Sequence, residues 1–309
     1  MYKLTKLLAT SGHQQQIWMK VTGFTFLRNA IVNDYPAKEA ILSVLPLCDD
    51  FIVALGNSTD ETSEMVKSID QKIRTINTIW DESIREGGRV FADETNKALA
   101  EISDDTDWMI YIQGDEAIHE DYLPLIKKEM EAELNNNNVE ALLLKYKHFY
   151  ASYDYLAESR RWYRREVRII KNLPGVHSYR DAQGFRINDR KLKVKLIDAY
   201  IYHYGWVKPP KGLQGKVRNF NQFYQTEEWI EENYPVQDTY DMHNADRLVH
   251  FKGSHPKVMQ ARIEAANWKF EKDLTQETPK MNFRRKVLQK IEDLTGLRLF
   301  EYRNYKIVK

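Results

Sequence analysis

WMIYIQGDEAIHED, residues 108–121, is the segment from which the fold class can be predicted. Its first five residues are apolar or aromatic, which is the length and composition of a buried β-strand. Gly114, Asp115 and Glu116 follow directly and predict a turn. A helical pattern then runs from Asp121 to Leu134. A strand that leads through a short turn into a helix is the repeating unit of an α/β sheet.

The same alternation continues on both sides of this stretch. Apolar runs of strand length cover residues 21–27, 51–55, 72–80, 108–112, 139–149, 164–171 and 196–201. Helical patterns separate the first five of these runs, and Asp34 is the expected cap of the first helix. This alternation predicts a parallel, doubly wound sheet with helices on both faces. Ligands of such sheets bind at the carboxyl ends of the strands, so the residues that follow each apolar run are the candidate site.

Composition and charge exclude several classes of protein. The chain has 309 residues, of which 42% are hydrophobic, enough for a sizeable core. Its 46 basic and 45 acidic residues give a net charge of +1, and a general nucleic-acid-binding protein usually shows a strong basic excess. The single cysteine, Cys48, excludes an intramolecular disulfide and is expected to be buried. No run approaches the ~20 apolar residues of a membrane span, so we expect a cytoplasmic protein.

The chain is expected to divide into three regions. Residues 1–20 turn polar before the first strand pattern begins and are expected to be an extension outside the folded unit. Residues 21–206 form the predicted main domain, with a first half at 21–135 and a second half at 136–206. Residues 207–309 are polar, and their spacing of apolar residues predicts a C-terminal helical region.

The acidic turn after residue 112 is the strongest candidate site. A carboxylate at Asp115 could hold Mg²⁺ or Mn²⁺, which prefer oxygen ligands and bridge phosphate groups. A diphosphate leaving group needs such neutralisation when its bond to a sugar breaks. The alternative is an ordinary acidic turn that caps the helix at Asp121. The position of the turn after the fourth strand of an alternating pattern favours the metal site.

Several segments, in order, resemble a family 2 glycosyltransferase with the GT-A fold. The matching segments are residues 26–30, 50–53, 58–62, 96–99, 107–108 and 113–116. Gln113-Gly-Asp115-Glu116 stands in the place of the Asp-x-Asp-Glu motif of the family. The resemblance covers about residues 21–206 and implies a GT-A-type, Rossmann-like mixed sheet with a C-terminal helical extension. It also implies transfer of a sugar from a nucleotide-sugar donor to a glycan, lipid-linked or protein acceptor, as in polysaccharide biosynthesis.

The resemblance also implies roles for individual residues. The nucleotide-sugar is expected to contact Arg28, Asn29, Asp60, Asn96, Gln113 and Asp115. Asp115 and His203 are the expected ligands of Mn²⁺ or Mg²⁺, with Glu116 near the metal or orienting the site. An alternative for His203 is a histidine that packs within an aromatic cluster.

Two positions depart from the family pattern. Gln113 brings no charge to the metal motif. Leu55 or Gly56 stands where the family often carries an acid that contacts the base, so UDP-, GDP- and dTDP-sugars all remain open as donors.

The base of an inverting transfer should be a carboxylate in the second half of the main domain. We choose Asp181, in a glycine-containing loop after a strand, although an Asx-turn beside Gly184 is the alternative role. Glu158 and Glu166 are weaker candidates, and Glu166 is expected to pair with a neighbouring arginine.

Aromatic and basic residues in the second half could contact substrate. One of Arg164, Arg165 and Arg168 could bind the diphosphate, although a solvated or ion-paired strand face is favoured for any one of them. One or two aromatic residues are expected to stack on a sugar, from Trp162, Tyr202, Tyr204 and Trp206. Residues 281–309 carry eight basic and three acidic residues. They could form a helix with a solvated basic side, which we favour, or a peripheral contact with the inner face of a membrane.

Two other classes of function compete with the transferase. A non-catalytic, GT-A-like nucleotide-binding or scaffold protein would explain the uncharged Gln113. A dehydrogenase would require a Gly-x-Gly-x-x-Gly turn after the first strand, and residues 21–30 contain only Gly23. A nucleotidyltransferase would want a glycine-rich loop with a lysine in the same place, which is also missing.

Overall fold

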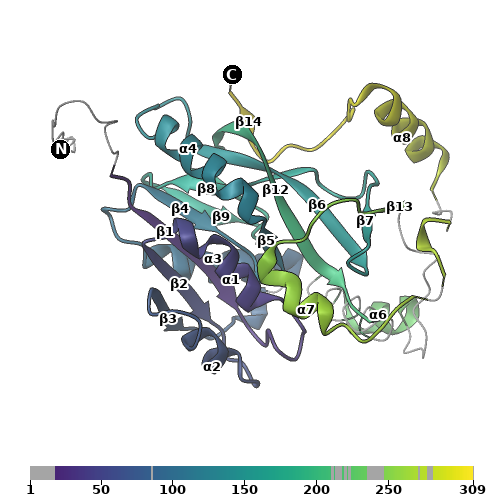
Figure 1. The fold of residues 1–309 in the computed structure, drawn as a ribbon, viewed down its shortest axis with the longest axis horizontal. Coiled ribbons are helices and arrows are strands. Elements are labelled where there is room, and N and C mark those ends of the chain that lie inside the picture. The colour runs from purple at the N-terminus through teal and green to yellow at the C-terminus, as the bar shows by residue number, and fades with distance from the viewer. Residues whose placement is uncertain are drawn as a thin grey trace.

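The computed structural model describes residues 18–84, 86–209, 212, 218, 221, 224–234, 247–270, 272–276 and 281–308. The N-terminal extension predicted for residues 1–20 therefore lies almost entirely outside the described part of the chain. Within that part, helices cover one large mixed sheet and a small three-stranded sheet packs beside it (Figure 1).

The bounds of the elements follow the predicted alternation closely. The large sheet contains β1 (Val21–Leu27), β2 (Asp50–Leu55), β3 (Ile73–Asn77), β4 (Trp108–Tyr111), β5 (Glu116–Ile118), β6 (Ala141–Ala151), β7 (Tyr155–Ala157), β8 (Arg165–Lys171), β12 (Lys193–Val207), β13 (Leu248–His250) and β14 (Lys306–Ile307). The small sheet contains β9 (Val176–Tyr179), β10 (Gly184–Ile187) and β11 (Arg190–Lys191). The helices are α1 (Ala37–Val44), α2 (Thr62–Lys67), α3 (Arg89–Ala100), α4 (Leu123–Glu133), α6 (Glu227–Asn233), α7 (Gln260–Glu264) and α8 (Phe283–Thr295).

The order of the strands creates a crevice between β1 and β4. The order along the large sheet is β13-β7-β6-β8-β4-β1-β2-β3. Strands β1, β2, β3 and β4 pair in parallel, whereas β8 is antiparallel to both β4 and β6. Strand β1 therefore lies between the strand that follows it in the chain and one from much later. Ligands of α/β sheets bind where the order of strands switches in this way.

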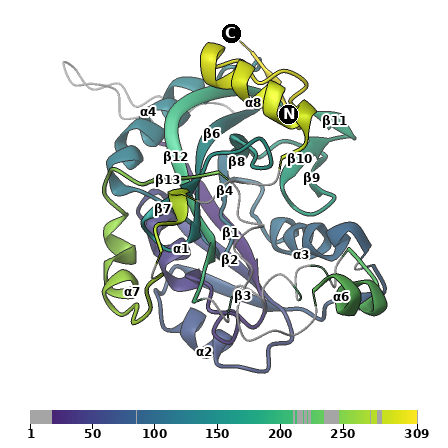
Figure 2. The ribbon, with the colours of Figure 1, turned by 90° about the vertical axis from the view of Figure 1, so that its right-hand side faces the viewer.

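Strand β1 shows why both faces of the sheet are covered. Val21 packs in one buried cluster with Ile41 of α1 and Met130 of α4. Phe24 points to the opposite face and packs with Ala98 of α3. Figure 2 shows α1 and α4 on one side of the sheet and α3 on the other. The predicted Rossmann-like mixed sheet with helices on both faces is confirmed, but its strands are not all parallel, because β8 runs antiparallel to β4 and β6.

Three details differ from the sequence prediction. The acidic turn leads first into a short strand, β5, which pairs with β12, and only then into α4. Region 207–309 contributes two short strands besides its helices, because β13 pairs with β7 and β14 pairs with β12. Asp34 does not cap the first helix. Pro36 holds the cap position, and the Asp34 carboxylate pairs with Arg262 of α7 at 2.5 Å.

Two predicted properties can be read directly from the structure. Cys48 is buried, as predicted, and this burial raises the pKa of its thiol to about 12. None of the described helices is long and apolar enough to cross a membrane.

Candidate functional site

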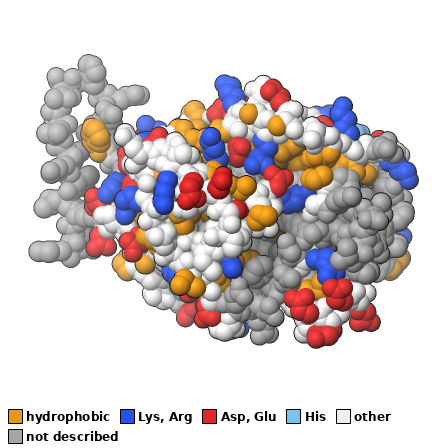
Figure 3. All heavy atoms as spheres, turned by 90° about the horizontal axis from the view of Figure 1, so that it is seen from below, with side chains coloured by type: hydrophobic (Ala, Val, Ile, Leu, Met, Phe, Trp, Pro, Cys, Tyr) orange, Lys and Arg blue, Asp and Glu red, His pale blue; other side chains and the backbone are white. Residues whose placement is uncertain are grey.

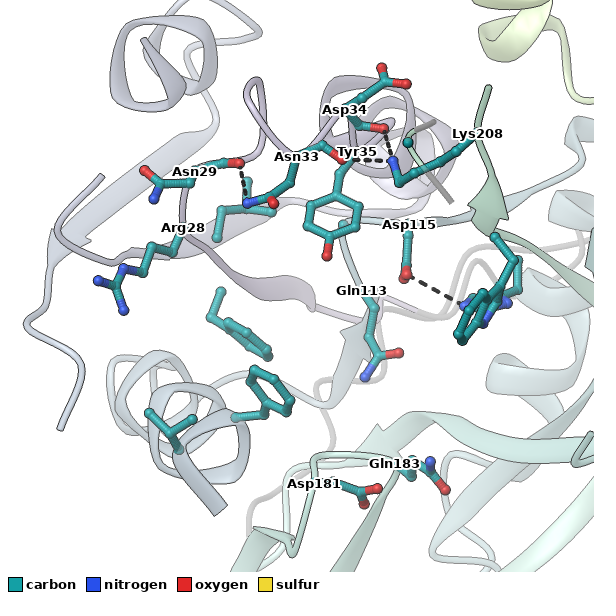
Figure 4. A pocket seen from close by; sticks show the side chains of 18 of the residues that line it. Arg28, Asn29, Asn33, Asp34, Tyr35, Gln113, Asp115, Asp181, Gln183 and Lys208 are labelled. Carbon is teal, nitrogen blue, oxygen red and sulfur yellow. Dashed lines mark hydrogen bonds and ion pairs between the residues drawn. The ribbon is translucent and has the colours of Figure 1, made fainter. Parts of the chain in front are cut away.

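A cavity of about 990 Å³ opens at the carboxyl ends of β1 and β4. Six of the residues predicted to bind or react with substrate line it: Arg28, Asn29, Gln113, Asp115, Asp181 and His203. In the view of Figure 4, Asp115 lies on the upper side of the cavity and Asp181 on the lower side. The two halves of the main domain therefore face each other across one pocket.

The pairing of β5 with β12 brings Asp115 and His203 together. His203 lies opposite Glu116 in this antiparallel pair, and the N–H of Tyr204 donates to the carbonyl oxygen of Asp115 at 2.8 Å. The two side chains meet, with Nε2 of His203 and Oδ2 of Asp115 3.4 Å apart (Figure 4). Gly114 must stay small in this turn, because a Cβ there would lie 2.6 Å from Leu27. The structure thus places His203 beside the acidic turn, and its role as a metal ligand stays a prediction.

A second histidine, His148 of β6, fixes the tautomer of His203. Nε2 of His148 lies 2.7 Å from the carbonyl oxygen of Tyr163, so this nitrogen carries a proton. Burial, together with the neighbouring His203, keeps the pKa of His148 well below its ordinary value, so the ring is neutral. Its Nδ1 must then accept from Nδ1–H of His203, at 3.1 Å. In neutral His203 the remaining nitrogen, Nε2, therefore presents a lone pair to Asp115.

A lone pair and a carboxylate oxygen 3.4 Å apart suit a shared cation. Two ligands ~2.1 Å from a metal ion and roughly 90–110° apart lie about 3.0–3.4 Å from each other. Metal-bound histidines commonly donate their other N–H to a fixed partner, as His203 does to His148. The donor set of one imidazole and one carboxylate fits Mn²⁺ better than Mg²⁺.

Glu116 anchors the turn and does not reach the cavity. It is fully buried and forms a two-pronged ion pair with Arg168, at 2.8 and 2.9 Å. Its carboxylate also accepts from the hydroxyl of Tyr146 at 2.7 Å and from the backbone N–H of Gln113 at 3.1 Å. Of the two roles considered for Arg168, the favoured one, an ion-paired residue of the strand, is observed, because its guanidinium is enclosed with Glu116. The first and last residues of the motif are thereby held while Asp115 projects from between them.

Asp181 lies in a tight loop between β9 and β10. Both of its neighbours adopt left-handed backbone angles, with φ of 56° at Arg180 and 60° at Ala182. Burial raises the pKa of the Asp181 carboxyl, and hydrogen bonds from backbone N–H groups and from Tyr224 only partly oppose this. Gly88 packs directly against the loop, since a Cβ there would lie 3.0 Å from Asp181. A carboxyl with a raised pKa at the edge of a cavity is suited to proton transfer.

Two predicted nucleotide ligands lie outside the cavity lining. The Asp60 carboxylate accepts from the backbone N–H groups of Ile31 and Val32, at 3.0 and 2.9 Å, and so fixes the loop after β1. Asn96 of α3 exchanges two hydrogen bonds with the backbone of Ser178 in β9. Their contact with nucleotide remains a prediction, but their side chains are already used to position the walls of the site.

The other predicted acids and arginines take structural positions. Among the described residues Glu166 forms no ion pair with an arginine, and one of its oxygens is buried without a hydrogen-bond partner. Burial raises the pKa of Glu166 to about 8. Arg164 pairs with Glu301 at 3.0 Å, and the exposed Glu158 does not line the cavity.

The four candidate stacking residues separate into two groups. Trp162 and Trp206 line the cavity, in line with the expected one or two aromatic contacts. Tyr202 and Tyr204 are buried in an aromatic cluster around Phe149 and do not line it.

Sequence reasoning missed one wall of the cavity. Phe26, Trp80 and Phe91 form an aromatic corner with ring centroids 5.7–5.9 Å apart, and Arg28 lies 5.1 Å above the Trp80 ring. Trp80 closely approaches the backbone at Gly56, the position where the family often carries an acid. The position of Trp80 just after β3 was the available signal.

Tyr35, Arg161 and Lys208 also line the cavity and were not predicted. The ammonium of Lys208 donates to the carbonyl oxygens of Asn33 and Asp34, at 2.6 and 3.0 Å, and so joins the end of β12 to the loop after β1. The position of Lys208 directly after a long apolar strand was the signal that could have revealed it.

A second group of possible metal ligands, His119, Glu120 and Asp121, lies outside the cavity lining. Both ring nitrogens of His119 are already within hydrogen-bond distance of protein atoms, Nδ1 at 3.2 Å from the N–H of Asp121 and Nε2 at 3.0 Å from Ser254. His119 therefore caps the short 3₁₀ turn, Glu120–Tyr122, that leads into α4.

Comparison with known proteins gives similarities to solved structures only. The chain matches no family model and no curated protein. TarS from S. aureus is 16% identical over 71% of this chain and 41% of TarS, with a TM-score of 0.38. Glucosyl-3-phosphoglycerate synthase from Mycobacterium tuberculosis, solved with Mn²⁺, UDP and glucosyl-3-phosphoglycerate, is 17% identical over 42% of this chain and 44% of that protein, with a TM-score of 0.29.

A 4-diphosphocytidyl-2C-methyl-D-erythritol synthase from Anaerococcus prevotii is 12% identical over 62% of this chain and 90% of its own length, with a TM-score of 0.36. The chain spans about two fifths of the length of the first two proteins. Identities and TM-scores this low transfer no activity, so the function must be argued from the side chains of this chain.

Proposed function

We propose that the protein is a metal-dependent glycosyltransferase that moves a sugar from a nucleotide-sugar donor to a hydroxyl of an acceptor. The observation that carries the proposal is the 3.4 Å approach of Nε2 of His203 to Oδ2 of Asp115 on one side of a large cavity, with Asp181 on the other. A divalent cation held by Asp115 and His203 would neutralise the diphosphate as it leaves. Two protein ligands leave coordination positions open for phosphate oxygens.

The remaining lining residues fit the parts of such a donor. The aromatic corner of Phe26, Trp80 and Phe91 offers ring faces on which a nucleobase can stack. Arg28 lies on the same wall and supplies guanidinium donors. Trp162 and Trp206 offer apolar ring surface for a sugar. Trp80 packs beside Gly56, where an acid could otherwise contact one kind of nucleobase. The donor is therefore left open among UDP-, GDP- and dTDP-sugars.

Asp181 is the proposed base. The acceptor hydroxyl would attack the anomeric carbon, its proton would pass to the Asp181 carboxylate, and the bond from that carbon to the diphosphate oxygen would break. Attack on the face opposite the leaving group inverts the configuration. A raised pKa makes the carboxylate a better proton acceptor, provided that it is ionised at the working pH.

A second candidate is a protein of the same shape that binds nucleotide without transferring a sugar. Gln113 favours it, because this residue gives the metal motif one carboxylate fewer than the family pattern. Turnover of a nucleotide-sugar by the wild type, lost in Asp181→Asn with nucleotide binding retained, would exclude it.

The test is a calorimetric titration with UDP, GDP and dTDP, each with and without Mn²⁺. We expect Mn²⁺-dependent binding of at least one nucleotide by the wild type. Asp115→Asn should weaken it strongly, whereas the control Asp121→Asn, an exposed acid next to His119, should bind as the wild type does. If no nucleotide binds in the presence of Mn²⁺, or if Asp115→Asn binds normally, the proposal is wrong.

A further inference from the structure

Helix α8 is amphipathic but faces the wrong way for a helix docked on a protein core. Its apolar side chains point outward, with 82% of Phe283, 41% of Val287 and 77% of Leu294 exposed. These positions fall within about 40° of one another around a helix of 3.6 residues per turn. A docked helix normally buries such a stripe.

The polar side of α8 holds it to the body of the protein. Glu292 pairs with Arg160 and Arg298, both at 2.7 Å, and Asp293 pairs with Arg247 at 2.6 Å. The Glu292 side chain is only 11% exposed. Both acids of the helix are thus neutralised, Glu292 against the body of the protein and Asp293 at the surface, where 42% of its side chain is exposed.

The basic residues of α8 remain on the outside and flank the apolar stripe. Arg284 lies on one side of the stripe and Lys286 and Lys290 on the other, and all three are exposed. Their side chains form no ion pair with the described residues. On the face of the molecule seen in Figure 3, basic and acidic side chains mostly occur side by side.

The apolar surface continues beyond the helix. Leu297, Phe300 and Tyr302 are 62%, 82% and 68% exposed, and Lys191 of β11 lies 5.3 Å from the Tyr302 ring. Figures 1 and 2 place α8 at the outer edge of the molecule, away from the helices that cover the sheet. The stripe and its continuation form one edge with apolar and basic side chains together.

We propose that this edge, formed by α8 and residues 297–302, binds an anionic lipid surface. The apolar side chains would enter the interface between headgroups and acyl chains, and the flanking cations would pair with anionic headgroups. A neutral apolar partner would explain the stripe but not the basic residues on both sides of it. The ion pairs of Glu292 and Asp293 with arginines outside α8 add to the match, because they leave the cations beside the stripe without an acidic partner on the helix.

The same edge is one loop away from the cavity. Arg160 contacts Glu292 of α8, and the carbonyl oxygen of Trp162 accepts from Arg298 at 2.5 Å. The neighbouring Arg161 and the Trp162 side chain line the cavity. A lipid surface bound at α8 would therefore hold the cavity close to lipid-linked acceptors, an extension that rests on the proposed function.

The test is sedimentation of the full chain with vesicles of phosphatidylcholine alone or with phosphatidylglycerol added. We expect binding to the anionic vesicles only, with release at high salt. Phe283→Ser/Leu294→Ser and, separately, Arg284→Glu/Lys286→Glu should each weaken binding by about tenfold or more.

Matched controls change exposed residues of the same kinds elsewhere. Ile79→Ser, at a side chain that is 77% exposed, and Lys127→Glu/Lys128→Glu on α4 should bind vesicles as the wild type does. Because the changed α8 side chains are exposed, thermal unfolding should stay near that of the wild type.

Three results would overturn the proposal: absence of vesicle binding by the wild type, unchanged binding by both α8 variants, or a lipid-free dimer that the α8 variants abolish. Nucleotide titrations on the α8 variants should match the wild type, so failure of lipid binding and failure of the proposed activity can be told apart.

Discussion

His148 does not line the cavity, yet replacing it should weaken metal binding. His148→Leu removes the acceptor of the Nδ1–H of His203, a bond of 3.1 Å between two buried rings. His203 would then be free to carry its proton on Nε2 and donate it to Asp115. In that tautomer Nε2 has no lone pair to offer a metal ion. Losing such an outer partner typically lowers metal affinity 10–100-fold. This range corresponds to ~1.4–2.7 kcal/mol, close to the ~1–3 kcal/mol cost of leaving a buried donor unpaired.

The assay is a Mn²⁺ titration by calorimetry, with and without a nucleoside diphosphate that the wild type binds. His148→Asn is the matched comparison, because its side-chain oxygen can take the place of Nδ1 and accept from His203. His148→Gln places its amide nearer to the position of Nε2 and should behave like His148→Leu. If folded His148→Leu binds Mn²⁺ within about twofold of the wild type, the tautomer reasoning is refuted.

Three further predictions concern other groups in and around the site. Burial raises the pKa of Glu166 from its ordinary 4.5 to about 8. Between these two pH values the folded protein keeps a proton that the unfolded chain has lost. The free energy of unfolding should therefore fall by about 3–5 kcal/mol as pH rises from 4.5 to about 8. In thermal unfolding, Glu166→Gln should not show this loss of stability as pH rises. Parallel profiles of stability against pH for the variant and the wild type would contradict the prediction. Glu116→Gln should cost about 3–5 kcal/mol by leaving Arg168 buried without its partner, whereas Glu116→Gln/Arg168→Met should recover part of this in chemical denaturation. A double variant less stable than the single one would argue against the pairing. Because burial raises the pKa of Asp181, turnover should rise with pH through a value above its ordinary 3.8, and Asp181→Asn should abolish turnover while leaving nucleotide affinity within a fewfold. A pH profile that is flat in the acidic range would count against Asp181 as the base.

Much of the fold was predictable because buried strands have a composition of their own. Strand β1 is predicted and observed at residues 21–27, since helices cover both faces and six of its seven residues are buried. Strand β5 was missed because it has three residues and begins with the charged Glu116. The burial of the Glu116 carboxylate depends on Arg168, which is about 50 residues away in sequence. No local pattern can reveal a strand that exists through such a distant ion pair.

The candidate site was partly predictable for a related reason. Residues placed directly after a strand, such as Asp115, reach the cavity because the topology carries every strand end to the same edge. His203 was predictable for its place on a late strand, but the role of His148 depends on the register between β6 and β12. Asp60 and Asn96 fit the sequence pattern equally well, yet their hydrogen bonds turn them toward backbone groups. Spacing alone does not distinguish a side chain that faces ligand from one that faces the protein.

The uncharged Gln113 is compatible with a working metal site. Asp115 supplies one negative charge and neutral His203 supplies none, while the charge of Glu116 is already balanced by Arg168. A divalent cation would therefore retain about one unit of positive charge after the protein has bound it. The oxygens of a diphosphate could neutralise this remainder, so metal and nucleotide should each raise the affinity of the other by the same factor. A site of this kind binds metal weakly alone and firmly with its donor, which is the behaviour that a neutral residue at position 113 favours.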